Sequence, residues 1–209
     1  MKDQVHNLII LDESGSMEPI KESIIAGFNE IVQTVKGIQL RFPEQEHYIS
    51  FVTFNGMGIK VHHLAAPVAS LAVIDHTKYH PNESTPLYDT MGFSCLKLKE
   101  HLQFQTGYNV LVTILTDGEE NASKEFNMLT IKKLVEELQT AGWGFTYIGT
   151  DHDVEKAASK LSISNTMKFN KNAAGIQQMF AVEQESRSIY SQKIRDKQDP
   201  NKDFYSKPQ

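Results

Sequence analysis

Three oxygen-bearing side chains stand at every second position near the start of the sequence. Asp12, Ser14 and Ser16 come directly after the apolar run Leu-Ile-Ile-Leu at residues 8–11. A carboxylate and two hydroxyls that leave a strand end with this spacing can converge on one point, and hard oxygen ligands favour Mg2+ or another hard divalent cation. Alternatively, these side chains only cap the helix that follows. The spacing alone leaves both interpretations open.

The elements that must position these side chains follow from the apolar periodicity. The run at residues 8–11 is typical of a strand buried on both faces, and the steps of three and four between Ile20 and Ile38 predict an amphipathic helix. Strands are predicted at residues 6–11, 48–54, 59–64, 108–116, 143–149 and 166–169, with the third antiparallel to the second. Helices are predicted at residues 20–38, 85–102, 151–161 and 172–195, and another ends near residue 141.

The alternation of strands and helices predicts a Rossmann-like, doubly wound α/β fold with a mostly parallel six-stranded sheet covered on both faces. In such sheets, ligands bind outside the carboxyl ends of the strands. Asp12 and Asp117 each follow a buried strand, and Thr85 directly precedes a helix from which its hydroxyl can reach the same edge. The sequence therefore predicts that these side chains gather at one edge of the sheet.

Composition restricts the class of protein. The 209 residues carry 21 Lys and Arg against 26 Asp and Glu, a formal net charge of −5. No dense basic run occurs, which disfavours a nucleic-acid surface. We expect one domain over residues 1–195 and a disordered tail at residues 196–209, which is charged and contains two prolines.

The cellular setting is predicted from cysteine content and hydropathy. Cys95 is the only cysteine, so no internal disulfide forms, and its place on an apolar helix stripe predicts a buried, unreactive thiol. No apolar stretch approaches the length of a membrane span, and the first residues lack the apolar segment of a signal peptide. We expect a cytoplasmic protein without membrane insertion, and its oligomeric state is not indicated.

Three segments resemble the metal-ion-dependent adhesion site (MIDAS) of von Willebrand factor A (VWA) domains. They are Ile-Leu-Asp-Glu-Ser-Gly-Ser-Met at residues 10–17, Ser-Thr-Pro-Leu-Tyr-Asp at residues 84–89 and Leu-Thr-Asp-Gly-Glu-Glu-Asn at residues 115–121. Each stands in the family's order and expected context, and the resemblance spans about residues 5–170. It implies the strand order 3-2-1-4-5-6 with strand 3 antiparallel. Among the family's members, the stand-alone intracellular bacterial type is expected.

The resemblance also implies a role for each residue of the motif. Ser14 and Ser16 would bind the metal directly, Thr85 directly or through a water, and Asp12 and Asp117 largely through water. Neutral hydroxyls leave much of the 2+ charge uncompensated, and a partner's carboxylate can take the exchangeable position of the octahedral ion. The implied cofactor is Mg2+, with Mn2+ or Ca2+ as alternatives. The rim around the ion is expected to contain Glu13, Gly15, Ser84, Gly118 and Glu119.

Three functions are compatible with this sequence. The favoured one is a non-enzymatic, metal-dependent interaction module that binds an Asp or Glu side chain of a protein partner. The second is a Mg2+-dependent phosphohydrolase of the haloacid dehalogenase type, but that motif needs a second Asp where Ser14 stands. Neither a P-loop nor a G-x-S-x-G sequence occurs. The third is a structural subunit whose metal only ties loops together.

Two further expectations concern the second half of the sequence. The predicted helix at residues 172–195 has charged residues within its apolar stripe, so it either shifts with the state of the metal site or stays fixed on the sheet. Asp151 and Asp153 follow the fifth strand, where a helix cap is favoured over a second metal site.

Overall fold

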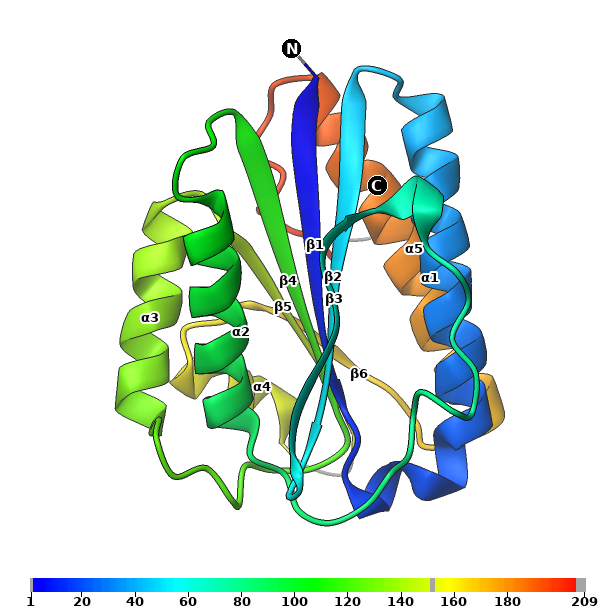
Figure 1. Cartoon of the computed structure of the whole chain (residues 1–209), viewed down its shortest axis with the longest axis vertical. Coiled ribbons are helices and arrows are strands. Elements are labelled where there is room, and N and C mark those ends of the chain that lie inside the picture. The colour runs from blue at the N-terminus through cyan, green and yellow to red at the C-terminus, as the bar shows by residue number, and fades with distance from the viewer. Residues whose placement is uncertain (1, 151–152, 206–209) are drawn as a thin grey trace.

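The sheet is built outward from the first strand. The computed structural model describes residues 2–150 and 153–205. Its strands are β1 (Asp3–Asp12), β2 (Gln45–Asn55), β3 (Gly58–Pro67), β4 (Tyr108–Thr116), β5 (Gly144–Gly149) and β6 (Asn165–Lys168). They lie in the order β3-β2-β1-β4-β5-β6, all parallel except β3, which runs antiparallel to β2 (Figure 1). The predicted fold class and strand order are therefore confirmed.

Helices cover both faces of this sheet. They are α1 (Lys21–Arg41), α2 (Leu87–Leu102), α3 (Met128–Thr140), α4 (Val154–Lys160) and α5 (Ala173–Arg195), with short 3-10 helices η1 (Gly15–Ile20) and η2 (Val68–Ser70). In Figure 1, α1 and α5 lie on one face, and α2 and α3 lie on the other. Alternate residues of β1 serve the two cores: Leu8 and Ile10 pack with α2 and α3, whereas Ile9 and Leu11 pack with α1 and α5. Both faces of β1 are buried, as its unbroken apolar run predicts.

A glycine lets α1 and α5 approach each other closely. A Cβ atom built on Gly27 would lie 1.9 Å from the ring of Phe180 on α5, so only glycine fits at this position. Phe180 and its neighbours on α5 then fill the space between the two helices and the sheet.

A buried charge network attaches the second half of α5 to the sheet. The Arg187 guanidinium donates to Asn7 Oδ1 on β1 at 2.8 Å and to Thr113 Oγ1 on β4 at 2.7 Å. Its Nε lies 3.1 Å from a carboxylate oxygen of Glu183, one helical turn earlier. All four side chains are buried. The charged residues that interrupt the apolar stripe of this helix therefore face the sheet rather than solvent.

Two caps agree with the sequence patterns. Asn172 accepts the backbone N–H of Gly175 at the start of α5, and Asp153 accepts that of Lys156 at the start of α4. Asp153 thus acts as the favoured helix cap, whereas Asp151 lies outside the described residues. The helix after β4 begins only at Met128, because Asn127 forms a capping box there and the preceding residues form a long loop.

The segment after α5 differs from the disorder expected for residues 196–209. Phe204 is 3% exposed, and its ring centroid lies 6.0 Å from that of Tyr190 on α5. The Tyr205 hydroxyl donates to Glu183 at 3.0 Å. The two aromatic residues of this otherwise polar segment therefore pack against α5, while residues 206–209 lie outside the described part.

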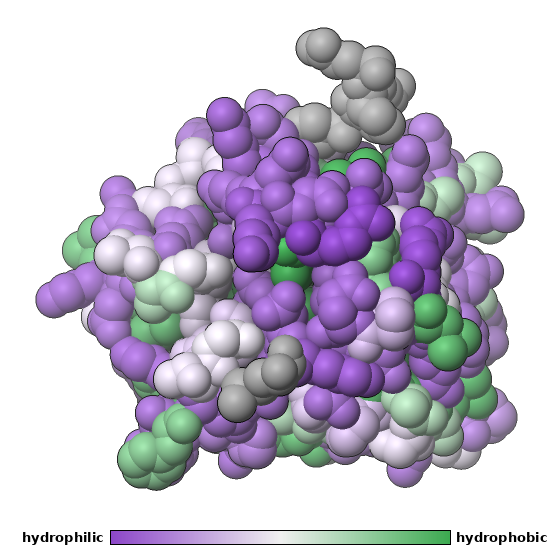
Figure 2. Space-filling view, turned by 90° about the horizontal axis from the view of Figure 1, so that it is seen from above, coloured by the Kyte–Doolittle hydropathy of each residue, from purple (hydrophilic) through white to green (hydrophobic). Residues whose placement is uncertain are grey.

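The amino-terminal edge of the parallel strands is mostly hydrophilic, with scattered apolar residues (Figure 2). Among the described residues, no helix combines the length and the apolar character needed to cross a bilayer.

Candidate functional site

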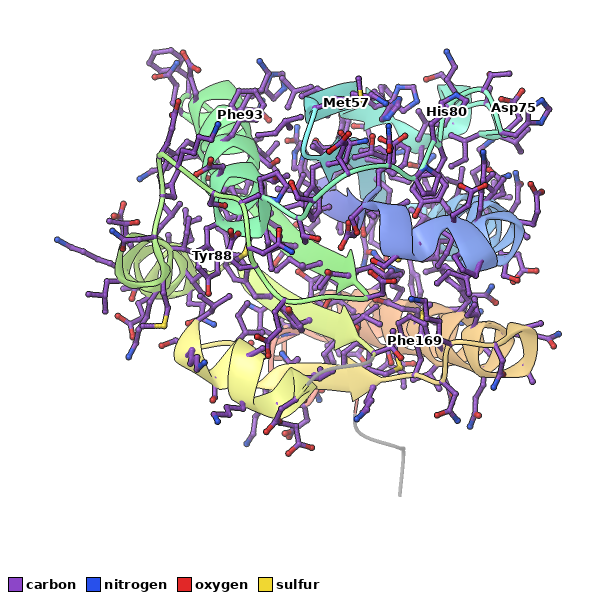
Figure 3. The ribbon with its side chains drawn as sticks, turned by 90° about the horizontal axis from the view of Figure 1, so that it is seen from below. Met57, Asp75, His80, Tyr88, Phe93 and Phe169 are labelled. Carbon is purple, nitrogen blue, oxygen red and sulfur yellow. The ribbon has the colours of Figure 1, made fainter. Side chains whose placement is uncertain are left out.

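The loops that carry the predicted site residues meet at the opposite edge, where the parallel strands end. Figure 3 views this edge from below, with Met57 of the β2–β3 turn, Tyr88 of α2 and Phe169 after β6 lying around it. The loops after β1 and β4 and the loop before α2 all reach this edge (Figure 1). The topology thus places distant parts of the sequence side by side, as expected at the carboxyl ends of a doubly wound sheet.

Four of the five predicted ligand residues form one connected cluster. The Ser14 and Ser16 hydroxyl oxygens lie 3.2 Å apart, and the Ser16 hydroxyl donates to Asp117 Oδ1 at 2.6 Å. The backbone N–H of Ser14 donates to Asp12 Oδ1 at 2.7 Å. Two hydroxyls and two carboxylates from β1 and β4 therefore converge, and the bond between Ser16 and Asp117 connects the two strand ends.

Asp12 is the most deeply enclosed member of the cluster. Its side chain is fully buried, and its Oδ2 accepts the Thr116 hydroxyl at 2.6 Å. Burial raises the pKa of Asp12 to about 6, because an ionised carboxyl group loses its hydration there. The hydrogen bonds from Thr116 and Ser14 oppose this shift in pKa, whereas the negative charge of Asp117 adds to it. A carboxylate in this environment gains from a nearby cation.

Thr85 is placed beside this cluster by the loop that follows β4. Its backbone N–H donates to Asn121 Oδ1 at 2.9 Å, and its carbonyl accepts the backbone N–H of Asn121 at 3.2 Å. Its hydroxyl oxygen lies 3.9 Å from the position that a Cβ on Gly118 would occupy. Thr85 therefore faces the residue directly after Asp117, at the edge where its hydroxyl was expected.

The loop after β1 is joined to the loop before α2 by backbone hydrogen bonds. Gly15 donates to the Glu83 carbonyl at 3.0 Å, and Asn82 donates to the Glu13 carbonyl at 2.8 Å. The Glu13 side chain is fully buried, lies 3.2 Å from the Lys60 ammonium, and accepts the backbone N–H of His80. Glu13 thus holds the loop in place and does not offer its carboxylate at the surface.

The other predicted rim residues differ in exposure. Gly15 and Glu119 are exposed, and Ser84 and Gly118 are half-buried. Ser16 is also exposed, so one metal-ligand candidate can be reached from solvent.

The β2–β3 turn belongs to the rim, although the sequence patterns did not indicate it. A Cβ built on Gly56 would lie 2.5 Å from the Ser84 hydroxyl oxygen, so the turn packs tightly on the loop before α2. The next residue, Met57, is 76% exposed. Its position at a turn between two predicted strands was the available signal, since turn tips at a sheet edge border any site there.

Lys171 is a second residue that the sequence patterns did not indicate. Its ammonium nitrogen lies 2.6 Å from Asp117 Oδ2. A lysine three residues after a strand that ends at the site edge was the only signal, and it is weak. The cluster thus contains a cation of the protein itself.

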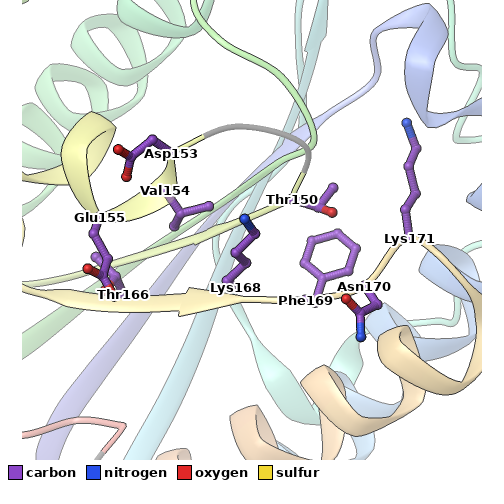
Figure 4. A pocket seen from close by; sticks show the side chains of 9 residues that line it. All are labelled: Thr150, Asp153, Val154, Glu155, Thr166, Lys168, Phe169, Asn170 and Lys171. Atoms are coloured by element: carbon purple, nitrogen blue, oxygen red, sulfur yellow. The ribbon is translucent and has the colours of Figure 1, made fainter.

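A cavity of about 640 Å3 opens next to Lys171, between the ends of β5 and β6 (Figure 4). The side chain of Lys168 projects into this space, whereas that of Lys171 extends away from it. The cavity is lined by Thr150, Asp153, Val154, Glu155, Thr166, Lys168, Phe169, Asn170 and Lys171.

The geometry of the cluster is compatible with a hard divalent cation. Two adjacent ligands of an octahedral Mg2+ ion, each at about 2.1 Å, are about 3 Å apart. The two serine hydroxyls are separated by 3.2 Å. In the described part of the chain, no group of three or more His, Cys, Asp or Glu side chains is arranged to hold a metal. The candidate ligands are therefore hydroxyls supported by two carboxylates, a set that suits Mg2+ better than a soft metal.

Known structures share this fold. No model of a known protein family matches the sequence, and no curated protein matches it. The structure of proximal thread matrix protein 1 from the mussel byssus is similar at a TM-score of 0.60 and 16% identity, over 88% of this chain and 46% of that one. This chain thus spans about half the length of the mussel protein.

Two shorter structures match over nearly their whole length. The vWF domain of the type V pili tip protein Mfa5 from Porphyromonas gingivalis has a TM-score of 0.56 at 10% identity, over 88% of this chain and 96% of that one. The SpRpn10 VWA domain has a TM-score of 0.59 at 10% identity, over 85% of this chain and 94% of that one. At these identities the likeness establishes the fold, which is that of VWA domains.

Proposed function

We propose that this protein is a metal-dependent interaction module that holds an Asp or Glu side chain of a protein partner through a Mg2+ ion. The observation that carries the proposal is the cluster of Ser14, Ser16, Asp12 and Asp117, with the two hydroxyls 3.2 Å apart and Ser16 exposed. Ser14 and Ser16 would supply direct ligands, and Thr85 a third. Asp12 and Asp117 would supply the negative charge and orient the hydroxyls.

The ligand chemistry favours a carboxylate from the partner. Hydroxyl ligands do not neutralise the ion, so a hard anionic oxygen is the best match for an open coordination position. The exposed Met57 on the rim offers an apolar contact beside that position. Exposed methionines adapt their shape to a partner, so Met57 suits a protein better than a small ion.

The metal is tested first, without any partner. Titration calorimetry with Mg2+ or Mn2+ should show one site in the wild-type protein. Ser16→Ala should weaken binding at least about tenfold, since an exposed ligand is lost while the fold keeps its core. Asp12→Ala should abolish it. Ser70→Ala is the matched control, because Ser70 is exposed on η2 and bonds only its own turn at Pro67 in the described structure.

The partner is tested next. Proteins captured by wild type in Mg2+ should be lost in EDTA and with Ser16→Ala, but retained with Ser70→Ala. Changing the partner's key carboxylate to its amide should weaken binding as much as Ser16→Ala, and the two changes together should not be additive, because both dismantle one bridge. A partner that binds equally well in EDTA and Mg2+ would instead support a structural metal.

We also propose that the protein turns over no substrate at this site. Ser14 occupies the position where a phosphohydrolase of the haloacid dehalogenase type needs its second aspartate. A Mg2+-dependent phosphatase rate that disappears in Asp12→Asn would contradict this and favour the phosphohydrolase alternative.

A cytoplasmic location completes the proposal, and its support is the single, buried cysteine. Two of the similar structures come from a pilus tip protein and from mussel byssus. Fractionation of cells that produce the natural protein would distinguish the locations.

A further inference from the structure

The two carboxylate oxygens of Asp117 have different partners. Oδ1 accepts the Ser16 hydroxyl at 2.6 Å, whereas Oδ2 lies 2.6 Å from the Lys171 ammonium. Among the described residues, no hydrogen-bond donor other than this ammonium reaches Oδ2. The Asp117 side chain is fully buried. A buried carboxylate oxygen needs such a partner, because its desolvation is costly.

The segment that carries Lys171 is fixed on both sides of it. Phe169 is buried, and its backbone N–H donates to the Gly149 carbonyl at 3.0 Å. Asn172 caps α5 through Gly175. The backbone therefore holds Lys171 next to Asp117, while its four-carbon side chain, 22% exposed, can swing outward without moving either anchor.

The charges of the cluster indicate what this lysine does. Among the described residues of the cluster, the two buried carboxylates of Asp12 and Asp117 and the Lys171 ammonium together carry one net negative charge. A divalent cation changes this to one net positive charge. The Lys60 ammonium does not alter the balance, because it is paired with Glu13. One carboxylate from a partner then makes the loaded cluster neutral.

We propose that Lys171 is an exchangeable cation of the binding site, which pairs with Asp117 while the site is without metal and turns to the partner's carboxylate once the metal is bound. This inference rests on the proposed function and adds a specificity-determining residue to it. Lys171 would weaken the affinity for metal alone and strengthen the affinity of the loaded site for an acidic side chain.

Lys171→Gln tests this pairing, because glutamine keeps a hydrogen-bond donor for Asp117 but removes the charge. Its matched control is Lys168→Gln, because Lys168 is an exposed lysine whose side chain projects into the cavity next to Lys171 (Figure 4). The first measurement is Mg2+ affinity by calorimetry. The second is the affinity of the Mg2+-loaded protein for acetate, followed by the NMR shifts of the Ser14 and Ser16 amides.

Lys171→Gln should tighten Mg2+ binding about tenfold and weaken acetate binding about threefold, because a positive charge next to the ion repels the ion and attracts the anion. Lys168→Gln should change neither constant more than about twofold, since water and salt screen the charge of an exposed lysine. Opposite changes for the two ligands distinguish this role from a general loosening of the loop, which would weaken both.

The outcomes separate this inference from the proposed function. If wild type binds Mg2+ and Lys171→Gln binds it equally well, or if both glutamine variants shift alike, the inference is wrong while the metal site stands. If Mg2+ binds only after Lys171→Gln, the inference is supported in its strongest form. If neither protein binds Mg2+ or Mn2+, both the inference and the proposed function fail.

Discussion

Replacing Arg187 by methionine is expected to cost about 4 kcal/mol of unfolding free energy. The guanidinium is 3% exposed and contacts α5, β1 and β4 at once, through Glu183, Asn7 and Thr113. Methionine fills a similar volume but leaves the Glu183 carboxylate buried without its cation. Breaking a buried ion pair from one side costs about 3–5 kcal/mol, most of it the penalty of the charge left behind.

The size of the effect can be measured by urea unfolding followed by circular dichroism. With an m-value of about 2.5 kcal/mol/M, a loss of about 4 kcal/mol lowers the midpoint by about 1.5 M urea. Arg195→Met is the matched control on the same helix, because Arg195 pairs with Asp196 in an exposed ion pair. Exposed pairs contribute little to stability because water screens them, so the control midpoint should move much less.

A double variant tests the assigned cause. Glu183→Leu combined with Arg187→Met removes both charges, so it should recover part of the loss, and the two single effects should be far from additive. Full recovery is not expected, because the Tyr205 hydroxyl and Asn7 also lose partners. Equal, small midpoint shifts for Arg187→Met and Arg195→Met would refute the reasoning that this network anchors α5.

Two further predictions concern acid stability and helix packing. Burial lowers the pKa of both His6 and His47 from 6.5 to about 4, so below about pH 7 the unfolded chain binds protons that the folded protein does not. The contribution of each histidine to the unfolding free energy should therefore be constant above about pH 7 and lower by about 2 kcal/mol at pH 5. Glutamine at both positions should remove this part of the pH dependence measured by urea unfolding. Gly27→Ala should lower stability by about 1–3 kcal/mol because its Cβ meets Phe180, whereas Gly37→Ala on the open side of α1 should raise it by up to about 1 kcal/mol, as measured by thermal unfolding.

The central strands could be predicted because they depend on patterns within short segments, whereas the full strand order was implied by the resemblance to VWA domains. The apolar runs that end at Asp12 and Asp117 identify strands buried on both faces, and such strands occupy the middle of a doubly wound sheet. The same reasoning placed Ser14, Ser16 and Thr85 at one edge. These residues belong to local motifs, so their spacing carries information that does not depend on how distant segments pack.

Residues that act alone and across long sequence distances were not predictable in this way. Lys171 has no periodic neighbour that marks it, and its contact with Asp117 depends on how Phe169 and Asn172 fix the turn between β6 and α5. Met57 reaches the rim only because Gly56 packs against Ser84. Phe204 had too few apolar neighbours in sequence to indicate a core position, and its partners come from α5.

The buried network on α5 corresponds to polar residues that interrupt apolar patterns in the sequence, and the structure explains these interruptions. Asn7 and Thr113 are polar residues within otherwise apolar strands, and Glu183 and Arg187 are charged residues one helical turn apart within an apolar stripe. A buried polar side chain needs a partner, so polar positions on a sheet and on the helix above it indicate each other. The polar strand residues and the charged helix residues could not be paired from the sequence, because only the fold shows that α5 packs over β1 and β4.

The two polar clusters of this protein differ in whether their side chains can change partners, and this difference determines which part of α5 should respond to metal binding. The Arg187 cluster is closed, because its charged and polar members contact one another and none of them is exposed. A shift of α5 along the sheet would break this cluster, which favours the fixed helix over the moving one. The Asp117 cluster is open, since Ser16 is exposed and Lys171 can exchange partners. Metal binding should therefore alter hydrogen exchange in the segment at residues 169–172 and in the first turn of α5, but leave exchange in the turns around Arg187 unchanged. Equal changes along the whole helix would show instead that α5 moves as one body.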